Sequence, residues 1–151
     1  MKGRIETAME KDVSITVRFA NKSDLDQCSE FDHTDRTDII ESKLDMHEII
    51  VAERCGQLIG YLKLEYIWSK LPYMALIILK PQYRGKGIGS LMLKYLVEFL
   101  QANDYMLLLS SSQVNESEPQ AWHRKKGFVE CGILNGINEG GIGEVFFRLD
   151  I

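Results

Sequence analysis

Residues 73 to 90 read Tyr-Met-Ala-Leu-Ile-Ile-Leu-Lys-Pro-Gln-Tyr-Arg-Gly-Lys-Gly-Ile-Gly-Ser and carry the strongest structural signal in the chain. The apolar run from Tyr73 to Leu79 predicts a strand, Lys80-Pro81 predicts a turn, and an amphipathic helix is expected from Ile88 onward. Between turn and helix lie alternating glycines and two cations, Arg84-Gly85-Lys86-Gly87-Ile88-Gly89. Glycines let a ligand approach the backbone, and the first turn of a helix offers unpaired N–H groups with a partial positive charge. The segment therefore predicts a site for a phosphate or pyrophosphate group.

The spacing of these glycines differs from that of two well-known phosphate-binding loops. A P-loop requires G-x-x-x-x-G-K-[ST], and the sequence contains no such run. A Rossmann loop requires G-x-G-x-x-G, but its last glycine would fall on Ser90. Neither nucleotide-binding loop accounts for the segment.

Arg84-x-x-Gly87-x-Gly89 resembles the Gln/Arg-x-x-Gly-x-Gly/Ala signature of the GNAT family of N-acetyltransferases. The resemblance includes the hydrophobic-x-Pro step at Leu79-Lys80-Pro81 and a second strand after the helix, at Tyr105 to Leu109. It also includes an aromatic-rich helix that closes on Gly127-Phe128. The motifs cover residues 73 to 128, and the family's element order covers residues 14 to 150.

Length, charge and cysteine usage restrict the class of protein. The chain has 151 residues, of which 45% are hydrophobic, enough for one domain with a sizeable core. A net charge of −4 without a basic cluster argues against a nucleic-acid partner. The longest apolar run is far shorter than the roughly 20 residues that span a bilayer, so no membrane partner is expected. Three widely spaced cysteines, Cys28, Cys55 and Cys131, predict a reduced, cytoplasmic setting.

Local patterns predict the elements and their ends. We interpret residues 1–12 as a mobile or added leader and residues 13–151 as a single N-acetyltransferase domain. Cys55-Gly56-Gln57 predicts a hairpin, Ser117 a capping box that opens the last helix, and Gly127 the end of that helix. Strands are expected at 14–19, 48–54, 58–68, 73–79, 105–109, 128–133 and 144–149, and helices at 23–31, 38–46, 88–100 and 117–126. The buried face of the long helix is predicted as Ile88, Leu91, Met92, Tyr95, Leu96, Phe99 and Leu100.

The runs 73–79 and 105–109 are apolar throughout, which is typical of central strands covered on both faces. The elements predict an α/β (α+β) fold. Its mixed, mostly antiparallel sheet would have six or seven strands, splayed central strands and about four flanking helices. Ligands of open sheets bind where neighbouring strands diverge, which here would be beside Gly85 to Gly89.

The resemblance implies acetyl-coenzyme A as the acetyl donor and no metal. In the family the pyrophosphate binds the signature loop, and the pantetheine arm pairs with the preceding strand as an added strand. A backbone N–H near Leu79 would then polarise the thioester carbonyl. Asn115 lies where family members hydrogen-bond the pantetheine or the acceptor, although it is equally a turn residue. The implied cofactor-binding residues are Ile77, Ile78, Leu79, Arg84, Gly85, Lys86, Gly87, Ile88, Gly89, Ser90 and Asn115.

The same resemblance implies direct attack by an amine in a ternary complex, which requires a base for the amine and an acid for the departing thiolate. Many family members place a tyrosine acid where this chain has His123. His123 is therefore either the acid or a buried structural histidine. Glu65, near the end of a predicted strand, is a candidate base, and Glu116 and Glu118 are alternatives. Each of the three is otherwise a solvated carboxylate.

Three other groups of residues have a structural or chemical interpretation. Cys131 is expected to be a core thiol, and His33 and His47 match no zinc spacing. The segments expected to form the acceptor pocket, residues 24–47, 68–73 and 132–143, are rich in acids that would suit a cationic amine such as a polyamine, an aminoglycoside or a lysine side chain. These acids are Asp32, Asp35, Asp38, Glu41, Asp45 and Glu139.

Two other functions stay open on sequence grounds. A non-catalytic sensor of acyl-coenzyme A, or a partner-docking module on the same fold, would bind the cofactor without acceptor turnover. A nucleotide-binding protein would use the same loop for ATP or NAD. Exposed strand edges and the apolar Val145-Phe146-Phe147 also suggest a homodimer.

Overall fold

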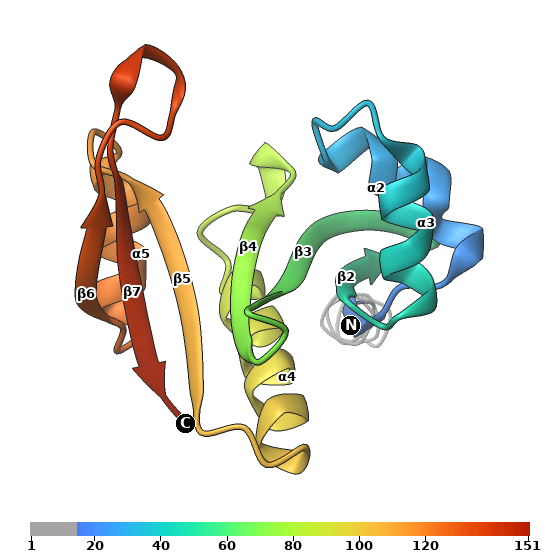
Figure 1. Cartoon of the computed structure of the whole chain (residues 1–151). Helices are drawn as coiled ribbons and strands as arrows, with labels where there is room; N and C mark the ends of the chain where they lie inside the picture. The colour runs from blue at the N-terminus through green and yellow to red at the C-terminus, as the bar shows by residue number, and fades with distance from the viewer. Residues whose placement is uncertain (1–14) are drawn as a thin grey trace, which may run out of the picture. The chain divides into compact units, whose positions relative to one another are not determined.

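The computed structural model describes residues 15–151, so the predicted leader lies outside the described residues. Within them the chain forms seven strands, four α-helices and three short 3-10 turns (Figure 1). The strands are β1 (Ile15–Phe19), β2 (Ile49–Arg54), β3 (Gln57–Ile67), β4 (Leu71–Leu79), β5 (Leu107–Gln113), β6 (Val129–Leu134) and β7 (Glu144–Asp150). The helices are α2 (Leu25–Phe31), α3 (Thr37–Asp45), α4 (Ile88–Ala102) and α5 (Ser117–Lys125), and the turns are η1 (Lys22–Asp24), η2 (Pro81–Tyr83) and η3 (Glu139–Gly141).

The strands follow the order β1-β2-β3-β4-β5-β7-β6 in a seven-stranded sheet. The pairs β1–β2, β2–β3, β5–β7 and β7–β6 are antiparallel, whereas β4 and β5 are parallel and pair at Tyr73–Leu109 and Met74–Ser110. The predicted fold class, a mixed and mostly antiparallel sheet of six or seven strands with about four helices, is confirmed.

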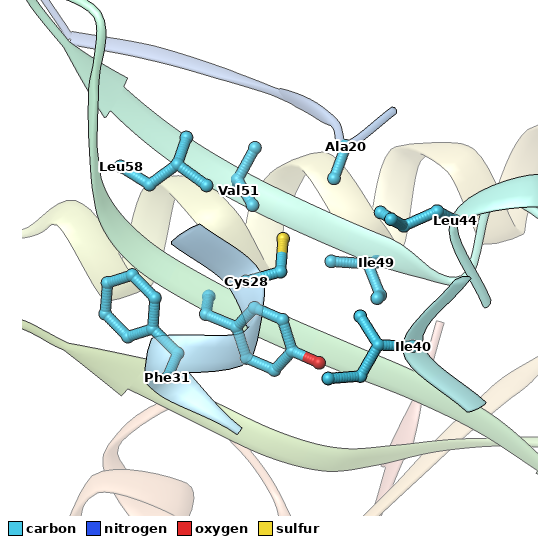
Figure 2. Packing of buried hydrophobic residues seen from close by; sticks show 9 residues of the cluster. Ala20, Cys28, Phe31, Ile40, Leu44, Ile49, Val51 and Leu58 are labelled. Carbon is cyan, nitrogen blue, oxygen red and sulfur yellow. The ribbon is translucent and has the colours of Figure 1, made fainter. Parts of the chain in front are cut away.

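The chain divides into two compact units, one formed by residues 15–63 and 76–96 and the other by residues 64–75 and 97–151. In the first unit, α2 and α3 cover one face of β2 and β3 with a tightly packed apolar cluster (Figure 2). Its buried members are Ala20, Cys28, Phe31, Ile40, Leu44, Ile49, Val51, Leu58 and Tyr61. Burial raises the pKa of Cys28 to about 12, so this thiol is neutral and inert at neutral pH.

The predicted hairpin between β2 and β3 is confirmed. Cys55 and Gly56 form a two-residue connection with φ angles of 50° and 76°. Two consecutive residues with positive φ give a turn whose twist matches that of the flanking strands. This turn sets the register of β2 against β3, in which Arg54 pairs with Gln57 and Glu53 with Leu58.

In the second unit, α5 lies against the sheet formed by β5, β7 and β6 (Figure 1). The strand predicted at 105–109 is instead Leu107–Gln113, because α4 ends in a tight turn in which Tyr105 N donates to Leu100 O (3.0 Å). In β5, half-buried and buried residues alternate, and the buried positions of its second half are the polar residues Ser110 and Ser112. Because these residues are not apolar, the apolar run in the sequence did not predict that the strand continues past Leu109.

Three smaller predictions about side chains are wrong. Leu91 of α4 is 50% exposed, whereas Leu93 is 6% exposed and takes its place on the buried face. Ser117 forms no capping box, because α5 begins with Glu116 at the N-cap and no side-chain cap bond. Cys131 is exposed, since every residue of the edge strand β6 is. Gly127 does end α5, with a φ of 94°.

Candidate functional site

The loop between β4 and α4 presents an open helix N-terminus. Gly85 and Gly87 adopt φ angles of 72° and 81°, and a Cβ on either would meet nothing within 4 Å. The first turn of α4 is closed by Leu91 N, which donates to Gly87 O (3.1 Å). The N–H groups of the first helical residues, from Ile88 to Ser90, therefore have no acceptor within the helix. This geometry suits an anionic group that approaches the backbone from outside.

Cations surround this loop. Arg84 and Lys86 are both exposed, and Arg84 Nε donates to Leu79 O (3.2 Å), which ties the loop to the end of β4. The ring of Tyr83 lies 5.8 Å from Lys86 Nζ and 5.9 Å from the guanidinium carbon of Arg54. Arg54, from β2, is a cation of this region that sequence reasoning did not identify, because nothing local links it to the loop.

A hollow of about 220 Å³ adjoins the loop in the same unit. Residues at the end of β4, including Ile78 and Leu79, form one side of it together with Arg84. The end of α2 forms the other side, with Glu30, Phe31 and His33 as lining residues, all within the segment 24–47 that was expected to contribute to the acceptor pocket. Three predicted cofactor-binding residues are thus brought together around one hollow, whereas Ile77 is not among its lining residues.

Close packing fixes the end of β4 beside this hollow. A Cβ on Gly60 would lie 2.7 Å from Leu79 Cδ2 and 2.8 Å from Met92 Sδ. Only glycine lets β3 pass this close to β4 and α4. The position of Leu79, the predicted oxyanion donor, therefore depends on a residue 19 positions earlier in the chain.

His123 is a core residue of the second unit. It is 4% exposed, and its ring stacks on Phe147 with centroids 4.7 Å apart. Nδ1 lies 2.8 Å from Pro119 O and Nε2 lies 2.7 Å from Ser110 Oγ. Since a carbonyl only accepts, Nδ1 carries the proton, and Nε2 accepts from the serine hydroxyl. Burial lowers the pKa of His123, so the ring is neutral at neutral pH and has no proton at Nε2 to give.

On the other face of β5 from His123, a chain of hydrogen bonds links three strands. Tyr73 Oη and Ser111 Oγ lie 2.6 Å apart, and Ser111 Oγ donates to Glu144 Oε1 (2.8 Å). Asn138 Nδ2 donates to Glu144 Oε2 (2.9 Å), and the ring of Tyr73 stacks on Phe146. Sequence reasoning missed this group, because its members lie 33 and 38 positions apart.

The remaining predicted site residues lie in the second unit without forming one cluster. Glu65 of β3 is half-buried, and its charge acts on Tyr73. Asn115 is exposed in the turn after β5, and Glu116 and Glu118 are exposed at the start of α5. Within residues 15–151, no group of three or more His, Cys, Asp or Glu side chains is placed to hold a metal ion. No helix in that range combines the length and apolar character needed to cross a membrane.

Half of the acids that suggested a cationic acceptor have partners inside the protein. Asp32 is buried and binds Lys63 Nζ (2.9 Å), and Asp38 binds Arg36 (2.7 Å). Asp45 lies 3.3 Å from Lys22 Nζ. Charges neutralised in this way attract a distant cation less strongly, so the charge argument for the acceptor is weaker than the sequence suggested.

Comparison with known proteins gives a family and a fold. Residues 45–130 match the acetyltransferase (GNAT) domain. The S-alkylcysteine N-acetyltransferase of Bacillus subtilis is 34% identical over 71 residues, which cover 42% of this chain and 40% of that relative. The match thus spans about two fifths of the length of this curated relative.

Several solved structures share the fold at low sequence identity. Ard1 from Thermoplasma volcanium has a TM-score of 0.79 at 14% identity, covering 91% of this chain and 98% of its own. The protein yncA from Salmonella typhimurium, solved with its cofactor acetyl-CoA, has a TM-score of 0.75 at 17% identity, covering 91% and 94%. A GNAT acetyltransferase from Bacillus cereus has a TM-score of 0.72 at 21% identity, covering 90% and 96%.

Proposed function

This chain belongs to the acetyltransferase (GNAT) domain family, and we propose that it is an N-acetyltransferase that moves the acetyl group of acetyl-CoA to a primary amine. The observation that carries the proposal is the open N-terminus of α4 behind Gly85 and Gly87, with Arg84 and Lys86 exposed beside it. Backbone N–H groups and nearby cations together favour a pyrophosphate.

The end of β4 supplies the second part of the proposed donor site. The pantetheine arm pairs with the backbone of Ile77, Ile78 and Leu79 as an added strand. The hollow beside Leu79 holds the thioester, where a backbone N–H polarises the carbonyl, an interaction worth roughly 2.7–4 kcal/mol in comparable sites. Arg84, bonded to Leu79 O, keeps this end of the strand in place.

The reaction is direct attack of the amine on the thioester in a ternary complex. A C–N bond forms, the C–S bond breaks, and coenzyme A leaves as a thiolate. We assign His123 a structural role, since both ring nitrogens are bonded in the core. Glu65 stays a candidate base, because its half-buried carboxylate makes no hydrogen bond or ion pair with any other described residue.

For the acceptor, two amine classes merit testing first. An S-alkylcysteine is suggested by the B. subtilis relative, whose name gives that substrate. A cationic amine is suggested by acids of the predicted acceptor segments, such as Asp35 and Glu139, that form no ion pair with another residue in the described range 15–151. A cytoplasmic setting stays a prediction, supported by three cysteines that form no disulfide.

The test is release of free thiol from acetyl-CoA with S-methylcysteine, spermidine or a lysine-containing peptide as acceptor. We expect release with at least one acceptor, above the rate without any. A sensor or docking module would be stabilised by acetyl-CoA yet release no thiol with any acceptor. A nucleotide-binding protein would be stabilised by ATP or NAD as much as by acetyl-CoA. Stabilisation by acetyl-CoA without thiol release, or equal stabilisation by ATP or NAD, would contradict the proposal.

A further inference from the structure

The hollow beside Leu79 is lined by charged side chains of both signs. Glu30 lies on its α2 side, and Lys80 and Arg84 lie at the end of β4 and in the loop that follows. The side chains of Glu30 and Lys80 form no hydrogen bond or ion pair with any residue in the range 15–151. Arg84 makes a single hydrogen bond, from Nε to Leu79 O. The hollow therefore offers one negative and two positive groups to a ligand.

Lys80 is the group in this lining that most needs an anionic partner. The residue is half-buried, and its backbone is fixed by the hydrogen bond from Lys80 N to Ile59 O (2.9 Å). Its Nζ lies 5.9 Å from the centre of the Phe31 ring, which also lines the hollow. A partly desolvated ammonium group is stabilised by a carboxylate that accepts its hydrogen bonds. Because the described part of the chain supplies no such carboxylate, the expected partner belongs to the ligand.

The α2 wall of the hollow is held in place and is partly apolar. Phe31, at the end of α2, is 7% exposed and stacks on Tyr61 with ring centres 5.9 Å apart. The next residue, Asp32, accepts from Tyr61 Oη (2.8 Å) and binds Lys63 Nζ (2.9 Å). These contacts fix the end of α2, and with it the position of Glu30. The Phe31 ring adds an apolar surface to the charged lining.

Resting on the proposed acetyl transfer, we propose that the acceptor is a small zwitterionic α-amino acid with an apolar side chain, bound in this hollow. Lys80 binds its carboxylate, Glu30 attracts its ammonium group, and Phe31 packs against its side chain. The hollow of about 220 Å³ is smaller than the roughly 300–1,000 Å³ of pockets for drug-sized ligands, so it suits a small acceptor. Two cations beside one acid repel a polyamine, which carries no negative charge.

The charges of the reacting groups fit this arrangement. The ammonium group loses one proton to water before its nitrogen attacks the thioester and a second as the C–N bond forms. The C–S bond breaks, and the departing thiolate takes one proton from water. The N-acetylated product retains its carboxylate but carries no positive charge. It therefore keeps the contact with Lys80 and loses the attraction of Glu30, which favours its release.

The test compares two acceptors that differ only in the carboxylate, S-methylcysteine and S-methylcysteine amide. We expect kcat/KM for thiol release to be about tenfold or more higher for the acid, the effect of one hydrogen bond between charged groups. Lys80→Gln should raise the KM for S-methylcysteine about tenfold, leave turnover of the amide unchanged and keep the KM for acetyl-CoA within about twofold. Glu30→Gln should raise the KM for both acceptors, since both carry the amine.

The matched control is Lys22→Gln. Lys22 is an exposed lysine of the same unit that pairs with Asp45 and does not line the hollow, so this change should affect neither acceptor. A preference for the acid that is lost in Lys80→Gln and kept in Lys22→Gln supports the inference.

Three results would overturn the inference and leave the acetyl transfer standing. The first is equal kcat/KM for the acid and the amide, or faster turnover of spermidine than of S-methylcysteine. The second is a Lys80→Gln variant that keeps the preference for the acid. The third is a Lys80→Gln variant whose loss falls on the KM for acetyl-CoA, which would assign Lys80 to the donor. Absence of thiol release with every acceptor would overturn both proposals, which separates the two failures.

Discussion

Adding one methyl group to Gly87 tests the donor site most directly. Gly87 has a φ of 81°, and a Cβ there would meet nothing within 4 Å, so the protein itself has room for alanine. The change has two consequences, backbone strain of about 1–2 kcal/mol in the left-handed region and a methyl group where a pyrophosphate would approach. Gly56, in the hairpin of the same unit, has a φ of 76° and equally open surroundings. Gly56→Ala therefore reproduces the strain without touching the ligand.

The expected magnitudes follow from ligand linkage. Acetyl-CoA at about 100 times its dissociation constant stabilises a protein by about 2.7 kcal/mol. For a chain of this size each kcal/mol moves Tm by about 2–4 °C, so the ligand should raise Tm by roughly 5–11 °C. If Gly87→Ala weakens binding tenfold, the same ligand concentration stabilises by only about 1.4 kcal/mol, which halves the shift. Gly56→Ala should keep the full shift from a lowered starting Tm.

The assay is thermal unfolding of the unmodified protein and both variants with and without acetyl-CoA, coenzyme A, ATP and NAD. Equal acetyl-CoA shifts in Gly87→Ala and Gly56→Ala would show that the loop glycine does not face the cofactor. The site argument would then fail even if the protein binds acetyl-CoA elsewhere.

Replacing His123 by leucine should lower Tm by several degrees, because it removes the hydrogen bonds to Ser110 Oγ and Pro119 O, worth about 1 kcal/mol each, and the stacking on Phe147. Thiol release measured well below Tm should persist, and a roughly 100-fold loss of kcat at unchanged Tm would refute the structural role. Gly60→Ala should destabilise the protein by about 1–3 kcal/mol, since its Cβ would lie 2.7 Å from Leu79 Cδ2, and chemical denaturation will measure this. The hydrogen bond from Arg18 lowers the pKa of Asp24 in the folded state. The ionised Asp24 therefore stabilises the fold at any pH above its unfolded pKa of about 3.9, and this stabilisation is lost as the pH falls through the lower pKa of the folded state. Asp24→Asn should therefore lower the unfolding free energy at pH 7 by about 1.5–3 kcal/mol relative to the unmodified protein. Denaturation at several pH values should show this difference between the two proteins shrinking below about pH 4, and a difference that stays constant from pH 7 to below pH 4 would contradict the role of the ion pair.

Local patterns were sufficient for the elements of the first unit and for the backbone geometry of the loop between β4 and α4. The Cys55-Gly56 hairpin and the strand–loop–helix order around Gly87 each depend on residues within a few positions of one another. Their backbone preferences, positive φ and helix-terminal N–H groups, belong to the segment itself. Turns and helix ends of this kind can be predicted from the sequence before any tertiary contact is known.

Features that depend on distant neighbours were decided by the tertiary structure. His123 is buried because Phe147 and Ser110 pack against it, and Cys131 is exposed because β6 is an edge strand. The strand predicted from the apolar run ended at Leu109, and β5 continues through its serines to Gln113 because these side chains have partners on neighbouring elements. The hydrogen bonds of Tyr73 with Ser111, and of Ser111 with Glu144, span 38 and 33 positions. Sequence periodicity indicates which face of its own helix or strand a residue occupies. The partner of a polar side chain depends instead on which strands are neighbours and on the register in which they pair, and both are fixed only when the sheet assembles.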